Sequence, residues 1–424
     1  LYARSSTPTT ATDMTKRSLL LENFLRYVGV PSQSKGGSSV VPSTEGQREL
    51  AALLEKELRA LGLKDVHLSP CSVLTGFLPS NLDHPSPKVG WVTHLDTVDV
   101  GLSPVIHPLL VKNYQGGDIL QNPETGATLF SKEHPELRSY LGDDILVSDG
   151  SSVLGADDKA AVSVVMTMLQ ILQECPSIPH GDIYVAFVPD EEVGLLGSKN
   201  MDYSRFPVDF AYTIDCCEKG EMVYETFNAG SAWLHIQGVS AHPMASKGNL
   251  VNPSMVALDF ISQFDRSETP ENTEGREGFI WVDKIETGVI DGLVSMKIRD
   301  HNKAKYEEKK SKIRKAMEEV QRLHPKAKLE LKFEDVYANI LDAVTEENRK
   351  CIDYLYAAFQ MADVEPKVIP MRGGTDGSFI STKGILVPNY FTGAHNFHSK
   401  AEFLPLSSFE KSLEVTLNLV HLCS

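Results

Sequence analysis

Apolar residues recur along the chain in two periods, one typical of helices and one typical of buried strands. Apolar positions three and four residues apart predict an amphipathic helix over 16–28. Leucines at the same spacing predict a second helix up to Leu61, with Thr44 and Gln47 as a capping box and Gly62 as its end.

Four short apolar runs predict strands that are buried on both faces, over 73–78, 88–93, 183–188 and 209–214. Between the second and third runs lies an unusually apolar segment, 159–173, which predicts a buried helix. Strands of this kind that alternate with helices indicate an α/β fold with a mainly parallel sheet covered by helices.

A different rhythm begins near residue 227 and predicts the element order βαββαβ, which is that of a small ferredoxin-like layer. Asn252 and Pro253 provide an N-cap and a first residue for its first helix. After about 337 the helix–strand alternation returns. We therefore expect one α/β domain formed by 14–226 and 337–424, with a smaller domain inserted at 227–336.

The first thirteen residues, rich in Ser and Thr and without an apolar stretch, are expected to form a disordered extension before Met14. The chain of 424 residues has 41 basic and 57 acidic residues, a net charge of −16, which argues against nucleic acid or anionic lipid as a partner. No apolar stretch reaches the ~18 residues of a membrane span. Six scattered cysteines without a C-x-x-C pair favour reduced thiols and a cytoplasmic location.

Residues able to bind metals follow several predicted strands. His94 and Asp96 end one strand, Glu191 and Glu192 follow another, and Asp215 ends a third. Open α/β sheets place their ligand sites at such strand ends. Each motif alone also fits a polar strand terminus or a solvated acidic turn. Together they form the mixed nitrogen and oxygen donor set that suits zinc.

Two further pairs leave a choice open when they are read from the residues alone. Asp157 and Asp158 precede the buried helix, where they could bind a cation or simply complement the helix dipole. His395 and His398 lie three apart in a loop near the end of the chain. Neither periodicity nor spacing decides which member of each pair is a ligand.

The motifs resemble the peptidase T family of tripeptide aminopeptidases, within the zinc peptidase superfamily that also contains carboxypeptidase G, aminoacylase and succinyl-diaminopimelate desuccinylase. The resemblance extends from about Met14 to the C-terminus, and the long interval between His94 and Asp157 is typical of this branch. The matching motifs are THLDT, LGADDKA, PDEEVG, VPSTEGQ (41–47), NYQGGDI (113–119), IPHGDI (178–183), IRD (298–300), RGGTDG (372–377) and NFHSKAEF.

This resemblance implies roles for seven residues. It gives His94 and Asp215 to one zinc ion, Glu192 and His398 to a second, and Asp157 to both as a bridge. Asp96 would hold the ring of His94, and Glu191 would be the general base. The resemblance therefore implies two Zn²⁺ ions, with Co²⁺ or Mn²⁺ as alternatives. A zinc-bound hydroxide would attack the first peptide carbonyl.

The resemblance also implies that 14–226 and 337–424 form the catalytic dizinc domain and that the inserted domain 227–336 is a lid with a substrate role. Arg299, on the polar face of its strand, would bind the substrate's C-terminal carboxylate, and His242 would close over the scissile carbonyl. Arg372 and Asp376 are expected near the substrate without an assigned role. Where the family has glycines this chain has Cys216 and Cys217, which we interpret as tolerated small residues, although Cys217 would share a face with Asp215 if the strand continued.

The resulting hypothesis is a cytoplasmic dizinc aminopeptidase that removes the first residue of tripeptides. Its partner would be a small peptide with a free amino group, not nucleic acid or a membrane, and the family resemblance allows a homodimer. Two alternatives remain: a related dipeptidase or N-acyl amino acid amidohydrolase, and a non-catalytic relative that binds peptides.

Overall fold

The first two helices follow the predicted apolar spacing. In the computed structural model, which describes residues 11–424, α1 spans Ala11–Val28 and α2 spans Glu45–Ala60. The first helix thus begins inside the expected extension 1–13, whose residues 1–10 lie outside the described part of the chain. Leu50, Leu54 and Leu58 of α2 are fully buried. Gly62 follows the helix with a φ of 79°, as expected for a C-terminal glycine.

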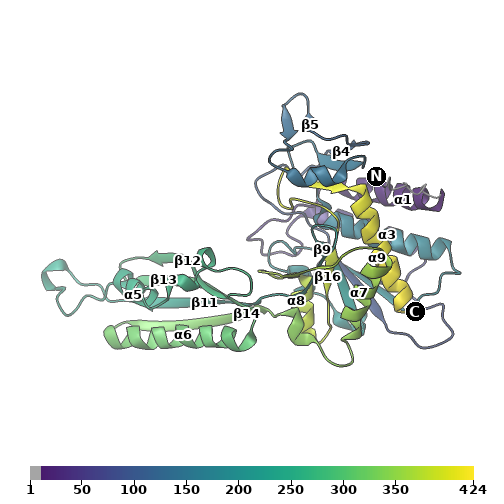
Figure 1. Ribbon diagram of the computed structural model, residues 1–424. Helices are drawn as coiled ribbons and strands as arrows, with labels where there is room; N and C mark the ends of the chain where they lie inside the picture. The colour runs from purple at the N-terminus through teal and green to yellow at the C-terminus, as the bar shows by residue number, and fades with distance from the viewer. Residues whose placement is uncertain (1–10) are drawn as a thin grey trace, which may run out of the picture.

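The body is built around an eight-stranded sheet in the order β1–β2–β8–β3–β9–β16–β10–β15 (Figure 1). These strands are β1 (Lys64–Leu68), β2 (Leu74–Leu78), β8 (Ile183–Val188), β3 (Val89–His94), β9 (Phe210–Cys216), β16 (Asn389–Phe391), β10 (Glu221–Glu225) and β15 (Lys367–Pro370). The four central strands from β8 to β16 run parallel, whereas β1–β2, β2–β8 and β16–β10 are antiparallel. The predicted α/β class is therefore confirmed, with a mixed sheet that is parallel at its centre.

Both faces of the central part of this sheet are covered, which is why its central strands are largely apolar. One face packs against α1, α3 (Ala156–Glu174), α7 (Lys350–Met361) and α9 (Leu406–Leu422). The predicted buried helix is α3, and nearly all of its residues are buried. The opposite face packs against a smaller cluster that includes Met201, Phe206 and Ile380, near the short helices α4 (Leu196–Lys199) and α8 (Asp376–Ile380).

The long interval after β3 forms a small structure for which the sequence predicts no elements. It contains β4 (Pro108–Val111), β5 (Ile119–Asn122), β6 (Ala127–Leu129) and β7 (Ile145–Ser148). β7 lies between β4 and the distant β17 (Phe403–Pro405), and β5 pairs with β6. Strands of three or four residues carry too little periodicity to be read from sequence. Their pairing with β17 links this interval to the loop that carries His398.

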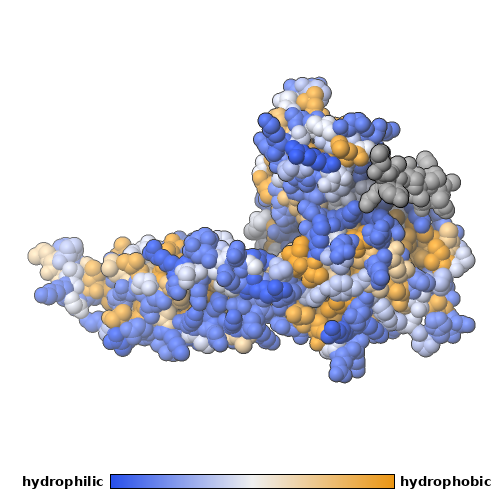
Figure 2. All heavy atoms as spheres, viewed as in Figure 1, coloured by the Kyte–Doolittle hydropathy of each residue, from blue (hydrophilic) through white to orange (hydrophobic). Residues whose placement is uncertain are grey.

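The inserted segment has the predicted order βαββαβ: β11 (Asn228–Gln237), α5 (Pro253–Ile261), β12 (Phe279–Thr287), β13 (Asp291–Asp300), α6 (Lys303–Leu323) and β14 (Lys328–Tyr337). Asn252 caps α5 as predicted. The four strands form an antiparallel sheet with its own core, and the segment extends from the body as a long arm (Figure 1). The outer face of α6 is hydrophilic (Figure 2). We propose to treat 227–336 as a separate lid domain.

Among the described residues, no helix combines the length and the apolar character that crossing a membrane requires.

Candidate active site

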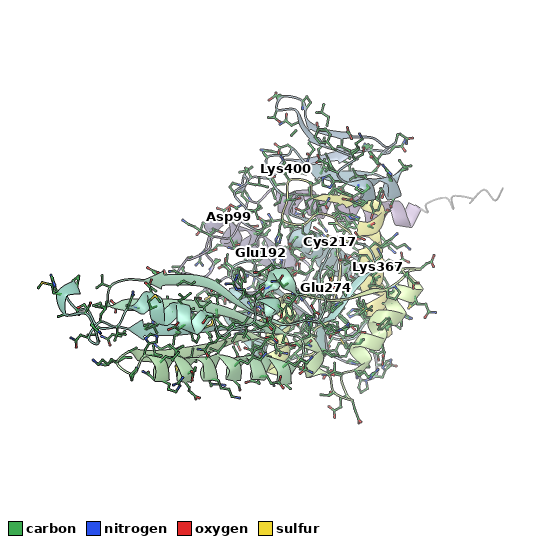
Figure 3. The ribbon with its side chains drawn as sticks, turned by 60° about the vertical axis from the view of Figure 1, so that its left-hand side comes forward. Asp99, Glu192, Cys217, Glu274, Lys367 and Lys400 are labelled. Carbon is green, nitrogen blue, oxygen red and sulfur yellow. The ribbon has the colours of Figure 1, made fainter. Side chains whose placement is uncertain are left out.

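The expected ligands meet because three neighbouring strands end at one edge of the sheet. β8, β3 and β9 are parallel, with His94 paired to Val188. His94 is the last residue of β3, and Asp215 is the last but one of β9. The Nε2 atom of His94 lies 3.7 Å from Oδ1 of Asp215 and 4.0 Å from Oε2 of Glu191, which follows β8. In Figure 3 the neighbouring Glu192 lies near the base of the arm.

Asp157 lies between two histidines and turns one carboxylate oxygen towards each. Its Oδ1 is 2.9 Å from Nε2 of His94, and its Oδ2 is 2.8 Å from Nε2 of His398. The same atom of His398 lies 2.8 Å from Oε1 of Glu192. Asp158 turns elsewhere, because its Oδ2 accepts a hydrogen bond from the backbone N–H of His94 at 3.0 Å. Asp157, and not Asp158, therefore lies between the two histidines.

The donor geometry fits cations better than it fits hydrogen bonds within the cluster. His94 Nε2 and Asp157 Oδ1 are both buried and neither makes a hydrogen bond to a described residue, although they lie 2.9 Å apart. Polar atoms left in this state are costly unless something binds them. The described residues contain three overlapping groups of possible ligands, and within each group the ligand atoms lie within 4.8 Å of one another. They are His94, Asp157, Asp158 and Asp215; His94, Glu191 and Glu192; and Asp157, Glu192 and His398.

The charges of the cluster also indicate a need for cations. Burial, followed by repulsion from Asp157, raises the pKa of Glu192 to about 8 and that of Asp215 to about 6. Burial raises the pKa of Glu191 well above its usual range. Hydrogen bonds to Asp157 and Glu192 raise the pKa of His398 to about 10. Without a cation, the folded protein therefore retains protons on groups that a metal ion would deprotonate.

Asp96 connects the ring of His94 to the two glutamates. His94 Nδ1 lies 3.0 Å from the backbone oxygen of Asp96 and 3.3 Å from its Oδ1. The two carboxylate oxygens of Asp96 accept the backbone N–H groups of Glu191 and Glu192, at 3.0 and 3.2 Å. Asp96 thus contacts the ring as expected, but most of its hydrogen bonding orients the segment that carries the glutamates.

Asp190 shapes the turn that presents the glutamates, a role the sequence did not reveal. Its φ is +56°, and its buried carboxylate accepts hydrogen bonds from the N–H of Ser43 and from Nε2 of Gln47, each at 2.7 Å. Oε1 of Gln47 accepts the Asp190 N–H in return, at 2.9 Å.

The predicted capping box is wrong, because the Thr44 side chain makes no cap bond and donates to the Gln33 carbonyl instead. Gln47 belongs to the site.

Glu402 is a second buried carboxylate that the sequence analysis did not find. Its Oε2 accepts the backbone N–H groups of Leu154 and Gly155, at 2.8 and 3.1 Å, and its Oε1 accepts that of Asp157 at 3.2 Å. Glu402 lies four residues after His398 in the chain. Its hydrogen bonds therefore link the loops that carry two of the expected ligands, His398 and Asp157. The spacing within NFHSKAEF was visible in the sequence, but the partner loop was not.

His395 and Cys217 lie beside the cluster without joining it. His395 stacks on Phe403 with ring centroids 4.7 Å apart, and its Nε2 lies 2.6 Å from the hydroxyl of Tyr140. The ring therefore supports the insertion after β3. β9 ends at Cys216, so the strand does not continue to Cys217, whose sulfur belongs to none of the ligand groups found among the described residues.

The lid residues differ in their distance from the cluster. Arg299 lies near the base of the lid, and its Nη1 donates to the carbonyls of Gly230 and Ile298 at 2.9 and 2.8 Å. His242 lies beyond the far end of β11, roughly 30 Å along a ten-residue strand, and its ring accepts the N–H of Met244. In this arrangement His242 does not approach the cluster of its own chain.

The RGGTDG loop joins the body to the lid. Arg372 donates from Nη1 to the carbonyls of Gly275 and Glu277, at 3.0 and 2.8 Å, and its guanidinium lies over the Phe227 ring. It therefore fastens the lid loop 266–278 to the body. Asp376 is buried, and burial is the main cause that raises its pKa to about 7.

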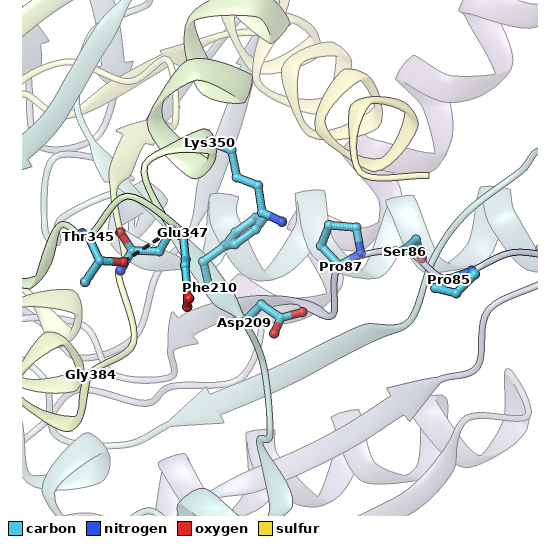
Figure 4. Close-up of a pocket in the computed structure, with 10 residues that line it drawn as sticks. Pro85, Ser86, Pro87, Asp209, Phe210, Thr345, Glu347, Lys350 and Gly384 are labelled. Atoms are coloured by element: carbon cyan, nitrogen blue, oxygen red, sulfur yellow. Dashed lines mark hydrogen bonds between the residues drawn. The ribbon is translucent and has the colours of Figure 1, made fainter.

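A separate hollow opens at the opposite ends of β3 and β9 (Figure 4). Its lining includes Pro87, Asp209, Phe210, Glu347 and Lys350. The charged side chains among these are exposed, and no group of ligand atoms lies there among the described residues. The chemistry of the chain is therefore concentrated at the other end of the sheet.

Comparison with known proteins identifies the family. Residues 155–422 match the family model described as Peptidase family M20/M25/M40, and a peptidase T-like protein of Yersinia pestis is 50% identical over 399 residues, covering 94% of this chain and 96% of that protein. The chain therefore belongs to peptidase family M20/M25/M40.

Within that family, the similarities place the chain with peptidase T. Peptidase T of Fusobacterium nucleatum is 39% identical over 410 residues, covering 97% of this chain and 99% of that protein. The solved structure of aminopeptidase PepT from Bacillus cereus has the same fold, with a TM-score of 0.74 at 21% identity, covering 96% of this chain and 98% of that one. The predicted family and enzyme class, a metallo-aminopeptidase of the peptidase T type, are thereby confirmed.

Proposed function

We propose that the protein is a dizinc aminopeptidase that hydrolyses the N-terminal peptide bond of tripeptides. One observation carries the proposal: the two oxygens of Asp157 face His94 and His398, with Glu191 and Glu192 beside them. The peptidase T similarity supports the substrate class. His94 and Asp215 would hold one ion, and Glu192 and His398 the other.

Zinc at these positions would polarise the scissile carbonyl and make the attacking water more acidic. Glu191 then acts as general base. Its side chain is nearly buried and its carboxylate lies beside the His94 ring, so it can accept a proton from the water and return it to the leaving amine. The positive charge of the ions would lower the raised pKa of this carboxylate and keep it ionised at neutral pH.

The lid supplies the second part of the proposal. Arg299 would bind the C-terminal carboxylate of the substrate, because a guanidinium matches two carboxylate oxygens. His242 would act at a scissile carbonyl only from a lid that reaches another site, since it lies a full strand length from the cluster of its own chain. A homodimer would satisfy this requirement and stays a proposal, as does the cytoplasmic location inferred from the free cysteines.

A product time course by mass spectrometry tests the proposal. Zinc-loaded protein would receive a free tripeptide, its N-acetylated form and a matching dipeptide. Release of the first residue from the free tripeptide alone, lost after chelation, supports the proposal. Restoring activity with Zn²⁺, Co²⁺ or Mn²⁺ identifies the effective metal. Cleavage of the acetylated peptide or the dipeptide instead favours an amidohydrolase or dipeptidase, and absence of turnover with intact zinc binding favours a non-catalytic relative.

A further inference from the structure

Tyr337, the last residue of β14, stands beside Arg299 at the base of the lid. Both pair with Ala229 of β11, from opposite sides, so the three side chains lie on one face of the sheet. Ala229 presents only a methyl group, and the guanidinium reaches across it. The Cζ atom of Arg299 lies 5.8 Å from the centre of the Tyr337 ring.

The body fixes the other side of this ring. A Cβ atom placed on Gly374, in the RGGTDG loop, would lie 2.5 Å from Cζ of Tyr337, so the ring rests directly on the glycine backbone. The next residue of the chain, Ala338, donates its N–H to the carbonyl of Ser378 in α8, at 3.2 Å. The ring is therefore held between the lid arginine and a loop of the body.

The phenol also lies within the electrostatic field of the catalytic cluster. Burial raises the pKa of Tyr337, the Arg299 guanidinium opposes that rise, and the Glu191 carboxylate adds to it. The phenol is thus close enough to the guanidinium and to the proposed general base for the charge of each to act on it. Two carbonyls occupy Nη1 of Arg299, so its remaining N–H groups and the phenol are the donors at this position.

We propose that Tyr337 is a substrate-binding residue, whose hydroxyl and the Arg299 guanidinium together bind the C-terminal carboxylate of the tripeptide. The inference rests on the proposed function, because it deepens the role given there to Arg299. A carboxylate has acceptors for both donors, and charge-assisted hydrogen bonds from two groups fix its position as well as its charge.

Under this proposal, the arrangement would also favour substrates that are three residues long. The ring of Tyr337 packs against the backbone of Gly374 in the body. The distance from the catalytic cluster to the carboxylate donors is therefore set by the body and not by the lid alone. Each residue of an extended peptide adds about 3.5 Å. If a tripeptide spans from the cluster to these donors, as proposed, a dipeptide would end one residue short of them and a tetrapeptide would extend one residue past them.

The decisive comparison uses Tyr337→Phe, which keeps the ring against Arg299 and Gly374 and removes only the hydroxyl. For the free-acid tripeptide we expect KM to rise about tenfold or more, the fold-change of losing one hydrogen bond to a charged group. For the same tripeptide with a C-terminal amide, we expect KM to change less than about twofold, because the charged acceptor is absent. Tyr356→Phe is the matched control, since its hydroxyl contacts Tyr224 in the body, and both KM values should stay as in the wild type.

Arg299→Met separates the inference from the proposed function. If the wild type prefers the free acid and Arg299→Met loses that preference while Tyr337→Phe keeps it, the arginine anchor holds and the inference about Tyr337 is overturned. If the wild type cleaves no tripeptide, both fall. If it cleaves acid and amide equally, the inference about Tyr337 is overturned while the proposed aminopeptidase activity stands. If Tyr337→Phe unfolds, Gly374→Ala gives the second test: displacing the ring should raise KM for the acid selectively, and an unchanged preference overturns the proposal.

Discussion

Replacing Glu402 with Gln tests how the site is held together. Oε2 of Glu402 accepts two backbone N–H groups and Oε1 accepts that of Asp157. A glutamine can keep its oxygen on the side with two donors, and its NH₂ group then faces the Asp157 N–H. Two buried donors lose their partners, at about 1–3 kcal/mol each. Burial, aided by Asp157, raises the pKa of Glu402 to about 7, so removing the charge offsets part of this cost. We expect a net loss of about 1–3 kcal/mol.

The Glu402→Gln change should lower zinc affinity as well as the free energy of unfolding. Partners that orient metal ligands typically change metal affinity by about 10- to 100-fold when removed. Glu402 links the Asp157 loop to the loop of His398, so we expect zinc affinity at the site that contains both residues to fall within that range. Zinc titration by calorimetry measures the affinity, and urea unfolding of the chelated protein measures stability. Glu57→Gln, which loses bonds to Arg26 and Tyr27 away from the site, is the control. Zinc affinity within twofold of the wild type for Glu402→Gln would refute the reasoning.

Three further results are expected. Glu191→Gln should lower kcat by about 10²- to 10⁴-fold with zinc stoichiometry unchanged, and a smaller loss would remove Glu191 as the base. In chelated protein, thermal stability should fall as pH rises from about 6.5 to about 9. Stability falls with rising pH because Glu192 and His398 have raised pKa values, about 8 and about 10, so the folded state binds more protons than the unfolded chain. The stability of zinc-loaded protein should depend less on pH. Equal slopes of stability against pH in the two forms would contradict this prediction. Gln47→Glu places a second carboxylate beside Asp190, so unfolding in urea should begin at lower concentration and kcat should fall, whereas unchanged kcat would mean that the turn does not depend on this contact.

The strand-end ligands could be predicted from sequence because the physics that places them is local. An apolar run followed by a polar residue locates a strand end, and parallel strands bring their ends to one edge. His94, Asp215 and Glu191 follow this logic, and the structure brings them together. Asp157 and His398 required the family resemblance, because neighbouring residues of the same type offered equal chemistry.

The residues that sequence analysis missed act through contacts distant in the chain. Gln47 bonds to Asp190 and Glu402 to the Asp157 loop, and the pattern around each residue fits a simpler local role. Gln47 was misread for this reason, since its spacing from Thr44 matches a helix cap. The insertion after β3 was missed because its strands are too short to show a period. Its contact with His395 holds that ring beside the cluster and outside the groups of possible ligand atoms among the described residues.

The order of the ligands along the chain has a consequence for how the protein matures on the ribosome. His94, Asp157 and Asp215 all precede the lid in the sequence, so the strands and the helix that carry them are synthesised early. His398 comes after the entire lid, and its loop is held by β17 near the end of the chain. In the proposed assignment, the donors for one metal ion are therefore synthesised well before the last donor for the second. A chain that ended after the lid would lack His398, so we expect hydrolytic activity to require synthesis through this last segment.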